Sequence, residues 1–206
     1  MEDLDTLVLR TAVGWHSAGE SVVLVTVART WGSSPRPPGS LMAINGRGET
    51  VGSVSGGCIE DDLIHRIREG GVEAVCATGT PSVLRYGISA DEAHRFGLPC
   101  GGTVELVLEP VAAHSRLGAL LLHCQQRRST ERLLNLNDGH VELREGQRDG
   151  VPSLDEHHLT TYLSLSEILC VRHSMSTRSM NATQDQTHRF GGPGGTAAIS
   201  HPGRAA

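Results

Sequence analysis

The chain has 206 residues, 38% of them hydrophobic, and carries a formal net charge of −5. This length suits one domain with a proper core, or one domain and part of a second. A net negative charge gives no general attraction to nucleic acid. No apolar run approaches the ~20 residues that a membrane span needs, so neither nucleic acid nor a membrane is an expected partner.

The cysteines and the N-terminus indicate a reducing compartment. Residues 1–5 are acidic and no apolar segment of a secretory signal follows, which predicts a cytoplasmic protein. The five cysteines form no C-x-x-C pair, and disulfides are not expected there. Cys76 in an apolar stretch and Cys124 on the apolar side of a predicted helix are expected core residues.

In chain order, the first half predicts a helix, a strand, a loop, a hairpin and a second helix. Apolar residues at helical spacing predict an amphipathic helix over residues 3–19. A β-branched run at 21–28 predicts a buried strand, and the prolines of 30–39 predict a stiff loop. Residues 41–54 predict a hairpin that leads into a helix from about 59 to 69.

The second half predicts a further series of short elements. They are strands near 73–77 and 82–86, a turn of helix near 90–95, an alternating strand at 103–109, a helix at 115–127, and a hairpin formed by 131–135 and 140–144. The whole pattern favours the α+β class, with a mixed sheet and flanking helices in one domain over residues 1–150.

The C-terminal part has a different composition. Residues 151–173 are predicted to be a connecting segment with a helix or a vestigial strand. From about residue 174 to 206 the chain is rich in Ser, Thr, His, Arg, Gly and Pro, with only isolated apolar residues. Such a segment buries too little apolar surface to offset its ordering entropy, so we predict a disordered tail.

One cysteine lies at the end of a glycine-rich turn. Residues 52–62 are Gly-Ser-Val-Ser-Gly-Gly-Cys-Ile-Glu-Asp-Asp, which sets Cys58 at the start of the predicted helix. The positive end of a helix favours a thiolate there. The N–H groups of Ser55, Gly56 and Gly57 suit a phosphate or another oxyanion. The alternative is that Cys58 only packs at a tight turn between strand and helix.

A second cysteine repeats this pattern. Residues 97–102 are Gly-Leu-Pro-Cys-Gly-Gly, so Cys100 precedes Gly101 and Gly102. A functional and a packing role are evenly balanced for this thiol. Arg36 lies between prolines and is either a rigid arm for an anionic ligand or a solvated loop charge.

Three separated motifs occur in order between residue 1 and about residue 112. They are Val-Thr-Val at 25–27 with Gly-Ser-Ser-Pro-Arg-Pro-Pro-Gly at 32–39, the cysteine motif at 52–60, and Leu-Pro-Cys-Gly-Gly-Thr-Val-Glu-Leu at 98–106 with Glu-Pro at 109–110. The residues of these motifs, their order and their spacing resemble those of the N-terminal domain of the XdhC/CoxI family.

This resemblance implies a maturation chaperone, more a carrier than an enzyme, for a molybdenum hydroxylase such as xanthine dehydrogenase or carbon monoxide dehydrogenase. Such a protein transiently binds the molybdenum cofactor (molybdopterin), protects it during sulfuration with a cysteine desulfurase, and passes it to the apo-enzyme. A homodimer is implied in the same way. Cys58 matches the family's Ser-Gly-Gly-Cys motif and is the expected thiolate contact to molybdenum. The other implied cofactor-binding residues are Cys100, Ser55, Gly56, Gly57, Arg36, Gly101 and Gly102.

The chain departs from longer members of that family near its C-terminus. Those members continue into a Rossmann-like domain, at the place of residues 163–178 here. Residues 165–171 resemble a vestigial strand, but no glycine-rich turn follows it. This pattern predicts either a natural short form or a shifted reading frame near residue 164.

An alternative from another class is an enzyme that acts on a small anionic substrate with Cys58 as its nucleophile. It needs a nearby base, such as His65, and loop N–H groups as an oxyanion hole. His65 follows Cys58 by seven residues, about two helical turns of ~5.4 Å each, which argues against direct pairing.

Overall fold

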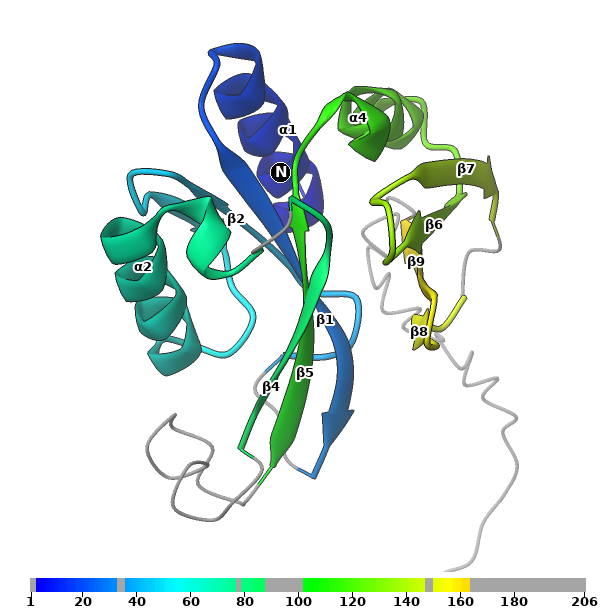
Figure 1. Cartoon of the computed structure of the whole chain (residues 1–206). Coiled ribbons are helices and arrows are strands. Elements are labelled where there is room, and N and C mark those ends of the chain that lie inside the picture. The colour runs from blue at the N-terminus through cyan, green and yellow to red at the C-terminus, as the bar shows by residue number, and fades with distance from the viewer. Residues whose placement is uncertain (1–2, 33–35, 77–78, 88–101, 147–149, 164–206) are drawn as a thin grey trace, which may run out of the picture. The chain divides into compact units, whose positions relative to one another are not determined.

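Figure 1 shows the computed structural model of the chain, which describes residues 3–32, 36–76, 79–87, 102–146 and 150–163. Every described residue lies in one compact unit, Met1–Glu167. The expectations for residues 90–95, 165–171 and 174–206 therefore lie outside the described residues.

The first sheet has five strands in the order β3-β2-β1-β5-β4, and each neighbouring pair is antiparallel. Its strands are β1 (Val22–Trp31), β2 (Leu41–Asn45), β3 (Thr50–Gly52), β4 (Ser82–Tyr86) and β5 (Thr103–Pro110). The long strand β1 lies at the centre because its β-branched residues are buried on both faces.

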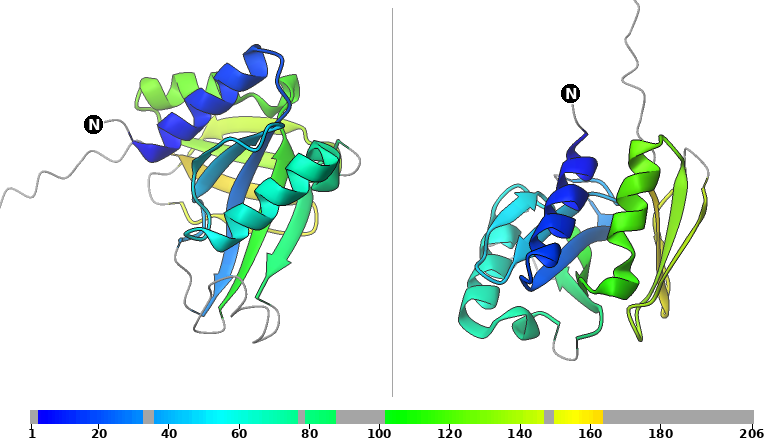
Figure 2. Two further views of the ribbon diagram at one scale, coloured as in Figure 1. Left: turned by 90° about the vertical axis from the view of Figure 1, so that its left-hand side faces the viewer. Right: turned by 90° about the horizontal axis from the view of Figure 1, so that it is seen from above.

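Helices cover both faces of this sheet. Helix α2 (Cys58–Gly70) packs on one face, in a core with Val23 and Val25 of β1. Helices α1 (Leu4–Ser17) and α4 (Leu117–Gln125) pack on the other face. The view from above in Figure 2 shows α2 and α4 on opposite sides of β1.

The second sheet has four antiparallel strands in the order β7-β6-β9-β8. They are β6 (Thr130–Asn135), β7 (Val141–Glu145), β8 (Ser153–Leu154) and β9 (His158–Leu163). A third core cluster joins this sheet to the first through Ala28 and Val107. The hairpin expected at 131–144 is confirmed by the β6–β7 pair.

The α+β class is confirmed, and its sheets are two antiparallel ones where we expected a single mixed sheet. The reason is the path of the chain: α2 and the short 3₁₀ helix η1 (Val72–Ala74) connect β3 to β4, the two edges of the first sheet. A helix that joins opposite edges in this way does not make two neighbouring parallel strands.

Two local expectations differ from the structure. Residues 73–77 were expected to form a strand, but Gly71, with φ +70°, ends α2 and the chain turns into η1. Val75 and Cys76 still pack in the core from this turn. The second sheet includes residues 153–163, beyond residue 150, where we expected a connecting segment. A further 3₁₀ helix, η2 (Ala113–Ser115), precedes α4.

Within the described ranges, none of the helices has the length and apolar character needed to cross a bilayer.

Candidate functional site: the loop before helix α2

Cys58 is the first residue of α2, as its motif predicts. Gly57 is the N-cap with φ +145°, and Gly56 has φ +116°, a region that favours glycine. Among the described residues, no heavy atom lies within 4 Å of the place where a Cβ atom on Gly57 would stand. The two glycines thus give the turn its backbone conformation.

The carboxylate of Glu60 lies within this loop and accepts hydrogen bonds from backbone N–H groups and serine hydroxyls. Its side chain is buried, with 8% of the residue exposed. Oε1 accepts from Val54 N and Ser55 N at 2.8 Å, Ser53 Oγ at 2.9 Å and Gly56 N at 3.3 Å, and Oε2 accepts from Gly57 N at 2.9 Å and from Ser55 Oγ. Glu60 stands three residues after the N-cap, the position of the acidic residue in a capping box.

These contacts change what the loop can do. The N–H groups expected to cradle a phosphate are those of Ser55, Gly56 and Gly57, and each of them donates to Glu60. The anion in this cradle is therefore part of the chain. An external oxyanion would need other donors unless the Glu60 carboxylate moved away.

Hydrogen bonding keeps Glu60 ionised. Burial acts to raise the pKa of this carboxyl group, but the Ser55 hydroxyl and the backbone N–H groups of Ser55 and Val54 lower its pKa to about 2. At neutral pH the loop therefore encloses a full negative charge.

Ser55 connects the loop to the helix. Its Oγ donates to Glu60 and accepts from Ile59 N at 3.3 Å, so the hydroxyl joins the loop to the first turn of α2. This side chain is buried and its contacts are internal. Its expected role as a cofactor contact stays a prediction.

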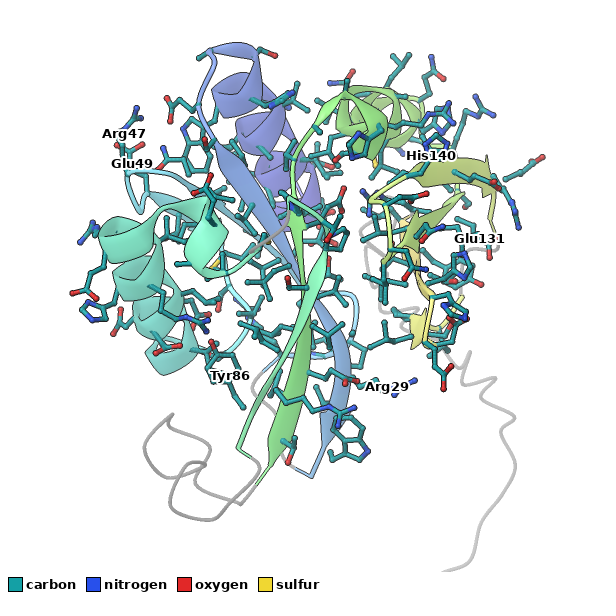
Figure 3. All side chains as sticks on the ribbon, in the orientation of Figure 1. Arg29, Arg47, Glu49, Tyr86, Glu131 and His140 are labelled. Atoms are coloured by element: carbon teal, nitrogen blue, oxygen red, sulfur yellow. The ribbon has the colours of Figure 1, made fainter. Side chains whose placement is uncertain are left out.

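The start of α2 lies near one end of the first sheet. Tyr86, the last residue of β4, donates from its hydroxyl to Asp62 of α2 at 2.9 Å, and Figure 3 shows Tyr86 beside the lower end of that helix. Burial and the carboxylate of Asp62 raise the pKa of the Tyr86 hydroxyl. This end of the sheet therefore carries the helix start that bears Cys58.

The described residues on either side of segment 88–101 lie at this same end. Thr103 pairs with Trp31 in the β1–β5 register and donates from Oγ1 to Gly87 O at 3.0 Å. A Cβ atom on Gly32 would lie 3.3 Å from the Cα of Gly102, so these two backbones approach closely. Cys100 and Gly101 lie outside the described residues.

The positive charge of Arg36 acts on the carboxyl group of Asp5 in α1. Burial and Asp3 raise the pKa of Asp5 to about 6, and Arg36 opposes this rise. The structure thus relates Arg36 to α1, and its expected role toward a cofactor stays a prediction.

His65 is directed to a neighbour on its own helix. Its Nε2 lies 3.3 Å from Glu69 Oε2, and both side chains are about 70% exposed. The described residues hold no group of three or more His, Cys, Asp or Glu side chains arranged for a metal ion. Cys76 and Cys124 are buried free thiols, as expected, and burial raises their pKa values to about 12 and about 11.

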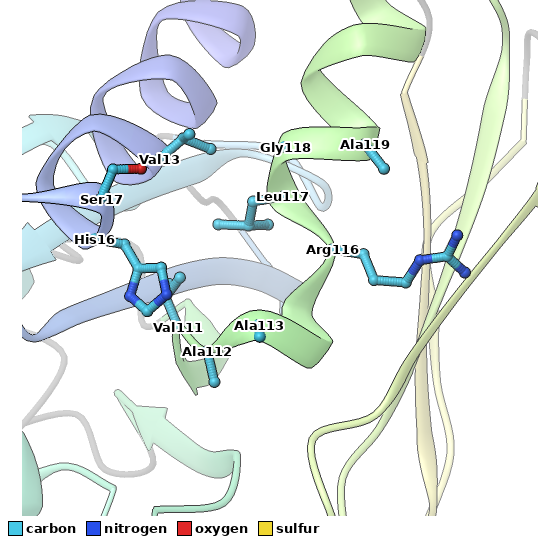
Figure 4. A pocket seen from close by; sticks show the side chains of 10 residues that line it. All are labelled: Val13, His16, Ser17, Val111, Ala112, Ala113, Arg116, Leu117, Gly118 and Ala119. Atoms are coloured by element: carbon cyan, nitrogen blue, oxygen red, sulfur yellow. The ribbon is translucent and has the colours of Figure 1, made fainter. Parts of the chain in front are cut away.

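A separate hollow of about 420 Å³ lies between the end of α1 and the start of α4. Figure 4 shows its lining residues, with Arg116 extending away from His16. The lining is Val13, His16, Ser17, Val111, Ala112, Ala113, Arg116, Leu117, Gly118 and Ala119. None of the residues predicted to bind a cofactor is in this set.

Comparison with known proteins identifies the motif-bearing segment. The model of the XdhC and CoxI family matches residues 15–87, which include Cys58, Glu60 and the loop before them. The resemblance to this family is confirmed.

Two curated relatives carry related names. The chain is 32% identical over 121 residues to the molybdenum cofactor insertion chaperone PaoD of Escherichia coli (strain K12), covering 59% of this chain and 36% of that protein. It is 27% identical over 99 residues to a probable xanthine dehydrogenase subunit of Bacillus subtilis (strain 168), covering 47% and 28%. The chain thus spans about a third of the length of these relatives.

A solved structure has a similar fold. A xanthine dehydrogenase from Bacillus halodurans aligns with a TM-score of 0.57 at 24% identity, over 79% of this chain and 53% of that one. At this identity the match concerns the fold, and it agrees with the α+β class.

Sequence reasoning missed Glu60 as a determinant of the site. The signal was present, because an acidic residue three positions after an N-cap is a capping-box pattern. The N-cap here is glycine rather than serine or threonine, so the usual pattern was incomplete.

Proposed function

We propose that this chain binds the molybdenum cofactor and takes part in the maturation of a molybdenum hydroxylase of the xanthine dehydrogenase or carbon monoxide dehydrogenase type. The observation that carries the proposal is the position of Cys58. It begins α2 within the segment that matches the family, behind a loop held by Glu60. The name of the Escherichia coli relative supports the same role.

The residues present suit such a ligand. Sulfur is a soft ligand that can bind a metal centre, and a helix N-terminus favours its thiolate form. When bound, the cofactor supplies a molybdenum centre and a phosphate. Because the Val54–Gly57 amides donate to Glu60, Cys58 is our first choice for contact and Cys100 the second.

Further parts of the proposed role are the partner proteins, the cellular compartment and the assembly of the chain. We propose that the chain carries the cofactor without catalysing a reaction, that sulfuration takes place with a cysteine desulfurase, and that the protein works in the cytoplasm, with a homodimer as its expected assembly. The implied binding set also includes Arg36, Gly101 and Gly102.

The alternative, a cysteine-dependent enzyme, finds less support in the described residues. Its candidate base, His65, contacts Glu69, and the loop N–H groups that would form an oxyanion hole donate to Glu60.

The test is retention of the cofactor by purified protein, detected after oxidation as the fluorescent pterin. We expect wild type to retain pterin and Cys58→Ala to lose most of it with little change in the melting temperature, because removing a thiol at the loop leaves a small cavity. Cys124→Ala, a buried cysteine of α4, is the matched control and should retain pterin. Equal retention by wild type and Cys58→Ala would contradict the assigned role of Cys58.

A further inference from the structure

Glu60 has more contacts than a helix cap requires. A capping-box acid accepts from the N-cap N–H, and Glu60 does so at Gly57. It also accepts from the N–H groups of Val54, Ser55 and Gly56 and from the hydroxyls of Ser53 and Ser55. One carboxylate therefore fixes every residue of the loop from 53 to 57.

The conformation of the loop depends on these contacts. Gly56 and Gly57 adopt φ values of +116° and +145°. A glycine without stabilising contacts populates many backbone conformations, so further contacts are needed to hold these two. Several N–H groups of the loop converge on one point, which favours an anion there. Those of Val54 and Ser55 are buried, where an N–H group without an acceptor is costly. The Glu60 carboxylate meets this need, while Ser55 Oγ continues the network to Ile59 N.

We propose that Glu60 is the positioning residue of the Cys58 site: its carboxylate takes the place of a ligand in the loop and holds Cys58 at the first position of α2 before any cofactor arrives. This inference rests on the proposed function. It implies that a bound cofactor contacts Cys58 and that the Val54–Gly57 amides, which donate to Glu60, take no part in binding.

The proposal can be separated from a general loss of packing by chemical rescue. Glu60→Ala removes the carboxylate and leaves converging N–H groups around an empty space. Acetate has the same acceptor group and the size of the missing part, so it should occupy this space. In Glu60→Gln the amide fills the space and turns donor hydrogens toward other donors, so acetate should not restore the loop.

The experiment measures amide hydrogen exchange at Val54–Gly57 and pterin retention in wild type and both Glu60 variants. We expect loop exchange to rise about 10-fold or more in each variant, because several hydrogen bonds are lost together, with pterin retention falling in parallel. Acetate, compared with chloride at equal ionic strength, should slow loop exchange in Glu60→Ala and restore part of its pterin. Glu69→Gln is the matched control: it alters an exposed carboxylate on the same helix, whose partner is His65, and should leave loop exchange unchanged.

Two results would overturn the proposal. Wild-type exchange of the loop amides in Glu60→Ala would mean that Glu60 does not hold the loop. Faster loop exchange with wild-type pterin retention would mean that the held conformation is not needed for binding. If wild type itself retains no pterin, the proposed function is wrong, and loop exchange still decides whether Glu60 fixes the loop.

Discussion

The protein buries two kinds of glutamate, and they act over different distances. Glu60 accepts from residues three to seven positions before it in the chain, so its contacts shape one loop. Glu109 of β5 accepts from Arg132 of β6 at 2.6 and 2.7 Å, with both side chains almost fully buried. The first carboxylate is satisfied by its own segment, whereas the second joins the two sheets. Loss of the first should loosen a site, and loss of the second should loosen the fold.

The largest expected effect comes from breaking the pair between the sheets. Arg132→Leu leaves Glu109 buried and unpaired, which should lower the free energy of unfolding by about 3–5 kcal/mol. Urea denaturation measures this change. The control is the double variant Arg132→Leu/Glu109→Leu, which removes both charges and should recover most of the loss. A single variant as stable as wild type would contradict the assigned role of the pair.

A smaller effect, dependent on pH, is expected at Glu60. Its folded-state pKa of about 2 lies below the ordinary value of 4.5, so its contribution to stability is fully present above about pH 4.5 and is lost as the pH falls toward 2. Glu60→Gln lacks the ionised carboxylate and therefore this contribution. The variant should have a free energy of unfolding about 1–3 kcal/mol below that of wild type near neutral pH.

The measurement for Glu60 is urea denaturation from pH 7 down to the lowest pH at which the protein stays folded. The difference in free energy of unfolding between wild type and Glu60→Gln should become smaller as the pH falls below about 4.5. If this difference in free energy of unfolding stayed constant over that range, the charge of the carboxylate would contribute nothing to the stability of the protein.

The sequence predicted those parts of the fold that depend on local pattern. The helices at 3–19 and 59–69 and the buried strand at 21–28 are confirmed because apolar periodicity and glycine stops act within a few residues. The pairing of β5 between β1 and β4 depends on contacts far apart in the chain, and local pattern does not contain it. The stretch 73–77 has the composition of a strand, yet after Gly71 its described part begins within η1 and continues as a turn to Cys76.

The candidate site shows the same division. The position of Cys58 at the start of α2 follows from the local motif, and the structure agrees. The acceptor of the loop N–H groups was not predicted, because the capping-box pattern lacks its usual Ser or Thr at the N-cap and a glycine-rich turn also suits a phosphate. Only the path of the Glu60 side chain back into the loop distinguishes them.

The smallest expected effect tests whether the Glu60 network is confined to its loop. Tyr86→Phe removes the hydroxyl that donates to Asp62, on the next turn of α2 after Cys58, and should lower the free energy of unfolding by about 0.5–1.5 kcal/mol. Because Glu60 and Ser55 keep their contacts in this variant, hydrogen exchange at the loop amides should equal that of wild type. If Tyr86→Phe raised loop exchange as much as Glu60→Ala does, the loop would be held by the packing of α2 on β4, and the contrast between a local and a long-range glutamate would not hold.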